Sequence, residues 1–430
     1  MAPAIVLRGD ARNLPLPDGC VDLIVTSPPY FGLRDYGYAG QIGSEGTPGE
    51  WLEALWACTA EWVRVLKPEG SLFVNLGDKY AGGQPHSNHG TGASTLNGHG
   101  GAGTIKDRAG KFRRTADFGD AQPKSLLGLP WRYAIGCMDR LGLILRAEVI
   151  WAKPNGLPES VTDRVRRAHE QVFHFTRQPR YYAAVDEIRE DYSASTQRSY
   201  QSGNGAARVG GSIHHHPSFT GRRVQDALPE GYAGNPLGKL PGSVWEIPSA
   251  PLQVPAHLGV DHFAAFPPAL VRPIVLGWSP PGVCTACAQG RRPVVERPSP
   301  LGNVRTSSVD RVSTPRGHLG STSTIMLSGG ARQKWEAANP PLLTGYACAC
   351  PEPDAPTRPA VVLDPFGGTG TTALVASAYG RTGVTVDLSA DYCRLAAWRV
   401  SDPGVRARAR DMPKPPPVPD GMEPLFDMKV

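Results

Sequence analysis

The segment at residues 360–372, AVVLDPFGGTGTT, constrains the fold more than any other part of the chain. A short apolar run ends in Asp364, a glycine-rich turn follows, and a helix is predicted from about Thr371 to Tyr379. Glycines let the backbone approach a ligand closely, and the start of the helix presents free N–H groups. A triphosphate-binding loop needs a lysine before its last Ser or Thr. This loop has no lysine there, so a triphosphate is disfavoured.

A second acidic residue stands at the distance expected for a nucleoside ligand. The strand predicted at residues 383–386 ends in Asp387, 23 residues after Asp364. An acid at the end of the second strand is placed to accept hydrogen bonds from both ribose hydroxyls. The pattern leaves a dinucleotide and S-adenosylmethionine both open. The structural alternative is a glycine turn followed by an ordinary helix-capping aspartate.

The remaining apolar runs predict an α/β fold with a doubly wound sheet. A helix is predicted over residues 49–66, where apolar residues recur at helical spacing before Lys67-Pro68-Glu69-Gly70. Further strands are predicted at residues 4–8, 21–26, 71–76, 147–151 and 172–175.

The order of these segments indicates a circular permutation. The strands of the glycine loop come last, and joining Val400 to Ala4 would restore a cofactor-first order, which is feasible because domain termini often lie close together. In that order Asp10 ends the third strand and can bond an adenine amino group, and the sequence TSPPY ends the fourth at Tyr30. Ligands bind at the carboxyl ends of such strands. The TSPPY turn and the glycine loop should therefore share one cleft.

The chemistry of the turn Ser27-Pro28-Pro29-Tyr30 suits methyl transfer to an exocyclic amine. Two prolines fix the backbone and remove two N–H donors. Ser27 Oγ and the Pro28 carbonyl can hold the amine hydrogens, and Tyr30 offers a flat ring to a base. Attack on the methyl group is then direct, so catalysis consists mostly of positioning and electrostatics. A base in duplex DNA must leave the helix to reach such a cleft.

VTSPPY together with DPFGGTGTT resembles the amino-group DNA methyltransferases of the permuted, beta-class chain order. The resemblance implies a seven-stranded Rossmann-like class I methyltransferase sheet with loop insertions, and S-adenosylmethionine as cofactor. It implies that Ser27, Pro28, Pro29 and Tyr30 are catalytic. The HFAAFP segment at residues 262–267 is similar to the family segment beside the methionine moiety. The implied cofactor-binding residues are Asp10, Asp364, Pro365, Phe366, Gly367, Gly368, Gly370, Thr371, Asp387, Phe263 and Phe266.

The same resemblance favours cytosine N4 as the target, because family members that make N4-methylcytosine usually carry Ser at the position of Ser27. Adenine N6 is the alternative. Methylation of cytosine at carbon 5 is disfavoured independently, because that chemistry needs a cysteine nucleophile in a Pro-Cys turn. None of the eight cysteines follows a proline.

Four cysteines form two close pairs late in the chain. Cys284 and Cys287 are separated by two residues, and Cys348 and Cys350 by one. Each pair can bind one side of a tetrahedral zinc ion, with a 60-residue loop between the two knuckles. A structural zinc site is predicted, with unligated thiols as the alternative. The run His214–His216 has no ligand partner at suitable spacing and is read as incidental.

Long irregular loops are expected because Gly 50 and Pro 43 together exceed a fifth of the 430 residues. The net charge of +6 fits a polyanion partner. We expect double-stranded DNA to be that partner and a cognate restriction endonuclease to be a possible companion. The resemblance extends to Trp151–Asn155, Pro158–Ser160 and Arg164. The candidate DNA contacts are Lys106, Lys111, Arg113, Arg114, Lys153 and Arg164.

The predicted organisation divides the chain into eight segments. They are a catalytic half with SPPY at 1–80, a Gly-rich basic loop at 81–125, the rest of the catalytic sheet at 126–190, a candidate target-recognition region at 191–245, a methionine-side segment and helix at 246–283, a Cys-pair insert at 284–350, an S-adenosylmethionine-binding half at 351–402, and a disordered Pro-rich tail at 403–430.

Several classes of protein are disfavoured by what the sequence lacks. It contains no apolar run of about 18 residues, so no membrane-spanning helix is expected. Its N-terminus has no signal-peptide pattern and its cysteines are sparse, so a reducing, cytoplasmic setting in a bacterial or phage-infected cell is expected. Two rivals stay open: a transferase that methylates RNA or protein, and a DNA-binding protein with an inactive site.

Overall fold

The computed structural model describes residues 2–33, 37–38, 40–81, 121–156, 158–192, 238–252, 254–260, 265–296, 342–352 and 354–412. The chain forms two compact units. The first comprises residues 1–184, 242–292 and 348–430, and the second comprises residues 185–241 and 293–347.

An eight-stranded sheet forms the centre of the first unit, in the spatial order β1-β12-β11-β2-β3-β5-β4-β6. In that order its strands are β1 (Ala4–Arg8), β12 (Thr382–Asp387), β11 (Val361–Asp364), β2 (Val21–Thr26), β3 (Leu66–Leu76), β5 (His169–Thr176), β4 (Ile144–Ala152) and β6 (Val244–Glu246). Only β5 runs antiparallel to its neighbours. The seven strands that the sequence predicts are confirmed, and β6, three residues long, adds an eighth.

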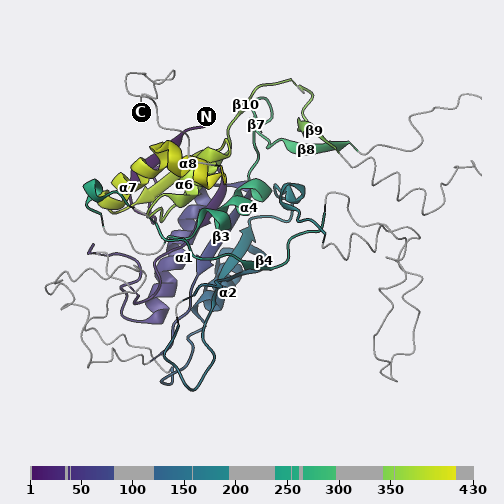
Figure 1. The fold of residues 1–430 in the computed structure, drawn as a ribbon. Coiled ribbons are helices and arrows are strands. Elements are labelled where there is room, and N and C mark those ends of the chain that lie inside the picture. Colours follow the sequence, from purple (N-terminus) through teal and green to yellow (C-terminus); the bar gives the residue numbers. More distant parts are fainter. Residues whose placement is uncertain are drawn as a thin grey trace, which may run out of the picture. The chain divides into compact units, whose positions relative to one another are not determined.

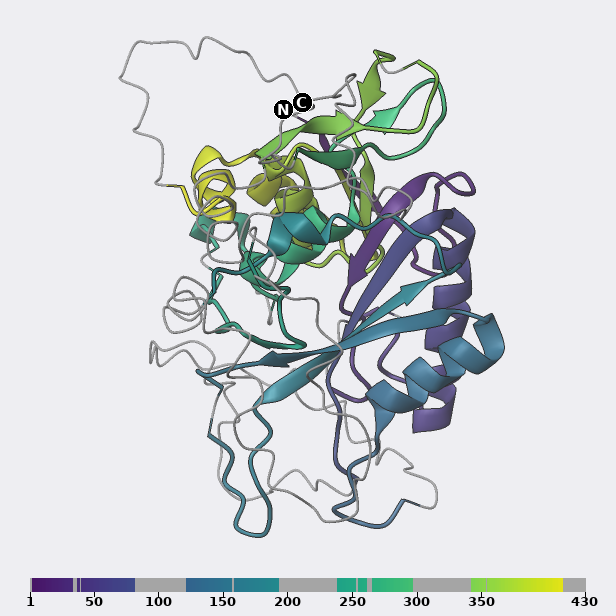
Figure 2. The same ribbon diagram turned by 90° about the vertical axis from the view of Figure 1, so that its right-hand side faces the viewer.

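Helices cover both faces of this sheet, as Figures 1 and 2 show, with α1 and α2 on one side and α4 and α6 on the other. The helices are α1 (Pro48–Val65), α2 (Leu129–Leu141), α4 (Pro268–Trp278), α6 (Thr371–Ala378), α7 (Ala390–Ser401) and α8 (Pro403–Ala409), with short 3-10 turns at Val185–Ile188 and Ala256–Leu258. None of the described helices combines the length and the hydrophobicity that crossing a bilayer requires.

Strand β2 explains why two helical layers are needed. All six of its residues are buried. Leu23 and Val25 pack with α4 and α6, whereas Ile24 packs with α1 and α2 on the opposite face. Because successive side chains of a strand point to opposite faces, a strand with no polar alternation requires cover on both sides. The continuous apolar runs of the sequence therefore predicted the doubly wound architecture correctly.

The predicted permutation is confirmed by the position of β1. This strand pairs in parallel with β12, with Ala4 opposite Gly383 and Arg8 opposite Asp387. Val400 near the end of α7 belongs to a cluster against which Ala4 packs. The N-terminal strand thus takes the place that the chain would reach by continuing from α7.

The tail differs from its prediction at its start. Residues 403–430 were predicted to be disordered, but Pro403–Ala409 form helix α8. A proline in the first turn costs no hydrogen bond, and Asp402 caps the helix by accepting from the Val405 N–H at 2.7 Å. Val405 and Ala409 are buried in the cluster that includes α6. The prediction is wrong for these residues because Val405 and Ala409 pack in the cluster that includes α6, which stabilises the helix.

Smaller sheets accompany the late part of the chain. In the first unit β7 (Val283–Cys284) pairs antiparallel with β10 (Thr357–Arg358). In the second unit β8 (Arg292–Glu296) and β9 (Leu342–Ala347) form a two-stranded sheet. Strands β8 and β9 fall within the predicted Cys-pair insert at 284–350, and β7 ends at its first residue, Cys284.

Candidate active site

The carboxyl edge of the sheet gathers polar residues from five neighbouring parallel strands. Read across the sheet, Asp10 follows β1, Asp387 ends β12, Asp364 ends β11, Ser27 follows β2, and Asn75 lies near the end of β3. The chain runs from β11 outward to β12 and from β2 outward to β3, so the strand order reverses between β11 and β2. Ligands of open α/β sheets bind at such a switch point.

The glycine loop lies against β12 without room for side chains. A Cβ at Gly367 would lie 1.5 Å from Thr385 Oγ1, and one at Gly370 would lie 2.8 Å from Ala396 Cβ. Gly370 also has a φ of +74°, which favours glycine. The loop is thus held close to the sheet, and the N-terminus of α6 begins immediately after it.

A buried arginine of α7 hydrogen-bonds to the glycine loop. Arg399 of α7 is 4% exposed and donates to the Thr369 carbonyl at 2.8 Å and to Thr371 Oγ1 at 2.9 Å. Burial lowers the pKa of Arg399 to about 10. The side chain of Thr371, which was predicted to bind the cofactor, therefore points into the protein. Only the backbone of Thr371, at the N-terminus of α6, is left for a ligand.

Asp387 ties the second strand to the glycine loop. Its two carboxylate oxygens accept hydrogen bonds from the Gly368 N–H and the Ser389 N–H, each at 2.8 Å. Burial raises its pKa, although these two hydrogen bonds oppose the change. Each carboxylate oxygen retains a further lone pair, so hydroxyl groups of a ligand can still be accepted.

Asp10 is already engaged by a neighbour. The Arg12 guanidinium bonds both of its oxygens, with Nη2 at 2.7 Å from Oδ2, and this interaction lowers the pKa of Asp10. The residue lies at the predicted edge, but an adenine amino group would have to share its oxygens with Arg12.

Asp364 connects the glycine loop to the TSPPY strand. Thr372 Oγ1 lies 3.0 Å from Asp364 Oδ2 and 3.1 Å from the carbonyl oxygen of Val25, which is two residues before Ser27. A hydroxyl has one hydrogen and cannot donate to both acceptors at once. Burial raises the pKa of Asp364 to about 7. The Thr372 hydroxyl can donate to ionised Asp364 or to Val25, and when Asp364 is protonated Thr372 can accept from it and donate to Val25.

Asp364 is expected to make the ligand-free protein less stable as the pH rises. Because the folded-state pKa is raised above the ordinary value of 3.8, the folded state binds the proton more tightly. Its contribution to the free energy of unfolding is full below about pH 4 and is lost through about pH 7. Urea denaturation of wild type and Asp364→Asn at about pH 5 and about pH 8 checks this. We expect the free energy of unfolding to fall less between these two pH values for the variant than for the wild type. An equal fall in both proteins would contradict the assignment.

The SPPY turn is held in place by packing on both sides. Trp51 Nε1 of α1 donates to the Pro29 carbonyl at 3.0 Å. A Cβ at Gly77 would lie 2.6 Å from Tyr30 Cε2, so the Tyr30 ring lies directly against the backbone after β3. Within the part of the chain that the structure describes, the Pro28 carbonyl accepts no hydrogen bond. Ser27 Oγ lies 3.4 Å from Tyr30 Oη and 3.3 Å from Asn75 Nδ2.

Three further polar side chains join the turn, and none was predicted to be catalytic. Tyr30 Oη donates to Glu170 Oε2 at 2.8 Å, and Asn75 Nδ2 lies 2.8 Å from the same oxygen and 3.0 Å from Tyr30 Oη. Lys153 donates to the other oxygen of Glu170. Asn75 could have been suspected as the polar residue within the apolar run SLFVNL. We call Ser27, Tyr30, Asn75, Lys153 and Glu170 the motif cluster.

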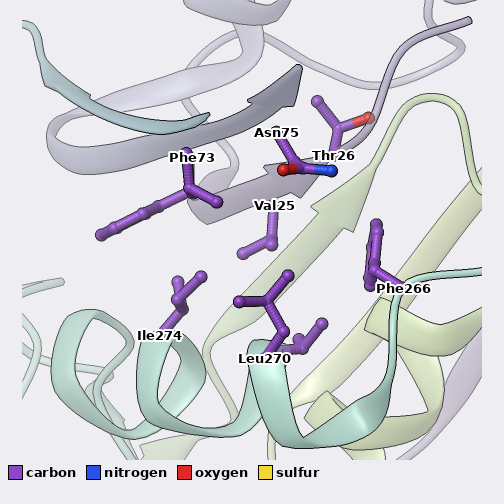
Figure 3. A pocket seen from close by; sticks show the side chains of 9 residues that line it. Val25, Thr26, Phe73, Asn75, Phe266, Leu270 and Ile274 are labelled. Carbon is purple, nitrogen blue, oxygen red and sulfur yellow. The ribbon is translucent and has the colours of Figure 1, made fainter. Parts of the chain in front are cut away.

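A small pocket lies beside the motif cluster, on the α4 face of the sheet (Figure 3). Strands β2 and β3 contribute Thr26 and Asn75 from above, and α4 contributes Leu270 from below. Thr26 Oγ1 and Asn75 Oδ1 are buried there without a hydrogen-bond partner among the described residues. Phe266 also lines this pocket, so the structure places one predicted cofactor-binding residue beside the turn.

The other predicted residues have mixed positions. Pro365 and Phe366 follow β11, and the Phe366 ring meets the edge of Trp62 with centroids 5.7 Å apart. Arg164 pairs with Glu159 at 2.7 Å and lies 3.9 Å from the Tyr80 ring centroid. The described ranges leave out five predicted site residues, namely Phe263, Lys106, Lys111, Arg113 and Arg114.

The four paired cysteines converge in the first unit. The sulfur atoms of Cys284, Cys287, Cys348 and Cys350 all lie within 4.8 Å of one another. Four sulfurs around a tetrahedral zinc ion lie about 3.8 Å apart, given a Zn–S distance of about 2.3 Å. The backbone N–H of Cys287 is the main cause of a lowered pKa at Cys284. The donor set and its spacing therefore fit a structural zinc ion.

Comparison with known proteins finds one matching family model, several similar relatives and similar solved structures. A family model described as DNA methylase, for methylation at N6 or N4, matches residues 21–285 and 357–397. Type II methyltransferase M.Cfr9I of Citrobacter freundii is 33% identical over 285 residues, covering 65% of this chain and 74% of that protein. M.XycI of Xanthomonas campestris pv. cyanopsidis is 34% identical over 279 residues, covering 64% and 73%. The solved PvuII cytosine-N4-specific DNA methyltransferase aligns with 94% of this chain and 89% of its own, at 15% identity and a TM-score of 0.48.

Proposed function

The chain belongs to the N6/N4 DNA methylase family, and we propose that it transfers a methyl group from S-adenosylmethionine to the cytosine N4 amino group of a base flipped out of double-stranded DNA. The observation that carries the proposal is the juxtaposition at the switch point. Thr372, which follows the glycine loop, bonds the carbonyl of Val25, and Val25 lies on the strand that ends in the SPPY turn. Residues 347 positions apart in the sequence thereby meet at one edge.

The cofactor side of the edge fits a nucleoside with a positively charged tail. Asp387 would bind the ribose hydroxyls, and Gly368, whose Cβ position lies near only the Phe366 carbonyl at 3.9 Å, lets the ligand approach the backbone. When bound, S-adenosylmethionine supplies an electrophilic methyl group. The raised pKa of Asp364 supports the same reading, because a cationic ligand would stabilise its ionised form.

On the substrate side, the SPPY turn holds the amine. The amine is a weak nucleophile because its lone pair is delocalised into the ring. Ser27 Oγ and the Pro28 carbonyl would each accept one of its hydrogens, which orients the nitrogen lone pair toward the methyl donor. The Tyr30 ring, fixed against Gly77, would stack on the base. The chemistry needs no proton removal before attack, so positioning is the main contribution of these residues.

Ser27 at the first position of the motif favours cytosine N4 over adenine N6. Sequencing that detects both modified bases in DNA from cells expressing the protein tests this choice. We expect N4-methylcytosine at one recurring sequence. N6-methyladenine at that sequence would replace the cytosine proposal with the adenine alternative, and no modified base would contradict both.

Binding to DNA is proposed to involve basic residues that the sequence predicts as DNA contacts. Arg164 lies on the loop between β4 and β5, and Lys106, Lys111, Arg113 and Arg114 lie outside the described residues. Lys153 was also predicted to contact DNA, and its ammonium pairs with Glu170. The relatives are named Type II methyltransferases, so we also propose a cognate restriction endonuclease as a partner.

The cysteine cluster is proposed to hold one structural zinc ion that closes the base of the insert between Cys287 and Cys348. Elemental analysis of the purified protein should give about one zinc per chain. Cys348→Ser should remove most of this zinc and lower the melting temperature. Cys20→Ser, which changes a half-buried cysteine outside the cluster, is the control. A zinc content near zero in the wild type would contradict the proposal.

A further inference from the structure

We propose that Glu170 is a positioning residue for methyl transfer, and that its carboxylate, held by Lys153, fixes the hydroxyls of Tyr30 and Ser27 so that a lone pair of Ser27 Oγ is free for the target amine. This inference rests on the proposed function and deepens it. It adds to the SPPY turn a carboxylate about 140 residues away in the sequence.

The topology of the sheet brings Glu170 to the catalytic edge. Strand β5 runs antiparallel to β3, so its first residues lie where β3 ends, with Gln171 opposite Leu76. Strand β4 ends beside them, with Trp151 opposite Glu170, and Lys153 follows. The antiparallel strands β4 and β5 thereby place the Lys153 ammonium and the Glu170 carboxylate at one edge of the sheet. The parallel strands place the SPPY turn and the glycine loop at the same edge.

Glu170 keeps its charge although its side chain is only 17% exposed. Burial raises its pKa, but the charge and hydrogen bond of Lys153, with further hydrogen bonds from Asn75 and Tyr30, outweigh that effect, so the pKa lies below its ordinary value. The Lys153 ammonium also lies 4.1 Å from the Trp151 ring centroid. Glu170 is therefore a pure hydrogen-bond acceptor at neutral pH.

Glu170, Tyr30 and Ser27 form a series of hydrogen-bonding groups. Because Glu170 can only accept, it sets the direction of the hydrogen bonds in this series. Tyr30 Oη must donate to Glu170, at 2.8 Å, and can then only accept from its other neighbours. Ser27 Oγ lies 3.4 Å from Tyr30 Oη, so the Ser27 hydrogen turns toward Tyr30. Asn75 Nδ2 has two hydrogens, and its contacts with Glu170 Oε2 at 2.8 Å and Tyr30 Oη at 3.0 Å are shorter than its 3.3 Å contact with Ser27 Oγ.

With its hydrogen turned inward, Ser27 Oγ presents a lone pair outward. A hydroxyl that donates into a chain ending at a carboxylate is also a stronger acceptor, because hydrogen bonds in such a chain polarise one another. The amine would thus meet an oriented acceptor at no reorganisation cost, which is how preorganised polar groups lower a barrier.

The decisive variant is Glu170→Gln. Its amide can donate to Tyr30 Oη, which reverses the chain and turns a hydrogen toward Ser27 Oγ. We expect kcat for DNA methylation to fall about 100-fold, while KM for DNA and the Kd for S-adenosylmethionine change less than about threefold. A residue that served folding alone would change stability without this split between kcat and KM.

Asp22→Asn is the matched control. Asp22 and Lys67 form another buried carboxylate–ammonium pair, but at the starts of β2 and β3, on the opposite edge of the sheet. This variant should lower the melting temperature and leave kcat within about threefold of wild type. Glu170→Gln combined with Tyr30→Phe should be no slower than Tyr30→Phe alone, because Glu170 acts through that hydroxyl.

The outcomes separate the two proposals. If the wild type methylates DNA and Glu170→Gln keeps kcat within about threefold, or if the effects of Glu170→Gln and Tyr30→Phe multiply, the positioning role is overturned. If the wild type transfers no methyl group to DNA, the proposed function itself fails.

Discussion

Replacing Ser27 and Tyr30 together by alanine is expected to lower kcat for DNA methylation by about 1,000-fold. Ser27 Oγ is one of the two proposed acceptors for the target amine, and the Tyr30 ring, which a Cβ at Gly77 would approach to 2.6 Å, is the proposed surface on which the base would stack. Losing both removes orientation and electrostatic stabilisation at once. The affinity for S-adenosylmethionine should be retained, because neither residue belongs to the glycine loop.

Single-turnover methylation of a duplex oligonucleotide measures the loss, and equilibrium titration measures the cofactor affinity. The matched control is Ser71→Ala with Tyr181→Ala, a serine and a tyrosine that both contact His174. Ser71 is the middle residue of β3, four residues before Asn75. Unchanged methylation by the Ser27 and Tyr30 variant would remove the SPPY turn from the mechanism.

Replacing Asp387 by alanine is expected to weaken the binding of S-adenosylmethionine by about 100-fold. The carboxylate would accept hydrogen bonds from the ligand, and it also holds the Gly368 N–H at 2.8 Å, so the variant loses a binding group and loosens the glycine loop. Two charge-assisted hydrogen bonds of about 1.5 kcal/mol each are sufficient for a loss of this size.

Titration calorimetry checks this expectation, with Asp391→Ala as the control. Asp391 lies four residues later in the first turn of α7, where it forms an exposed pair with Arg394 at 2.9 Å. That variant should bind S-adenosylmethionine as the wild type does. Equal affinities for the two variants would contradict the assignment of Asp387 to the cofactor.

The parallel part of the site could be predicted from the sequence because each functional residue follows its own strand. A buried parallel strand is a continuous apolar run, and the residue after the run must lie at the carboxyl edge. This reasoning placed Asp10, Ser27, Asp364 and Asp387 correctly. The chain order of the strands was sufficient to predict the permutation.

Glu170 could not be predicted in the same way, because it stands at the start of an antiparallel strand. Its position at the edge depends on the pairing of β5 with both β3 and β4, and a register is a tertiary property. Strand β6 was missed because three residues carry no periodic signal. Helix α8 was missed because it is short and begins with Pro-Gly, whereas its buried residues Val405 and Ala409 decide its structure.

The central claim is that the glycine loop and the SPPY turn share the carboxyl edge of the sheet, where a methyl donor would meet a DNA base. Incubating the purified protein with methyl-labelled S-adenosylmethionine and equal amounts of duplex DNA, RNA and protein tests it most directly. We predict label in duplex DNA, recovered as a nucleoside methylated on its exocyclic amine. Label in protein or RNA alone, or at carbon 5 of cytosine, would contradict the account.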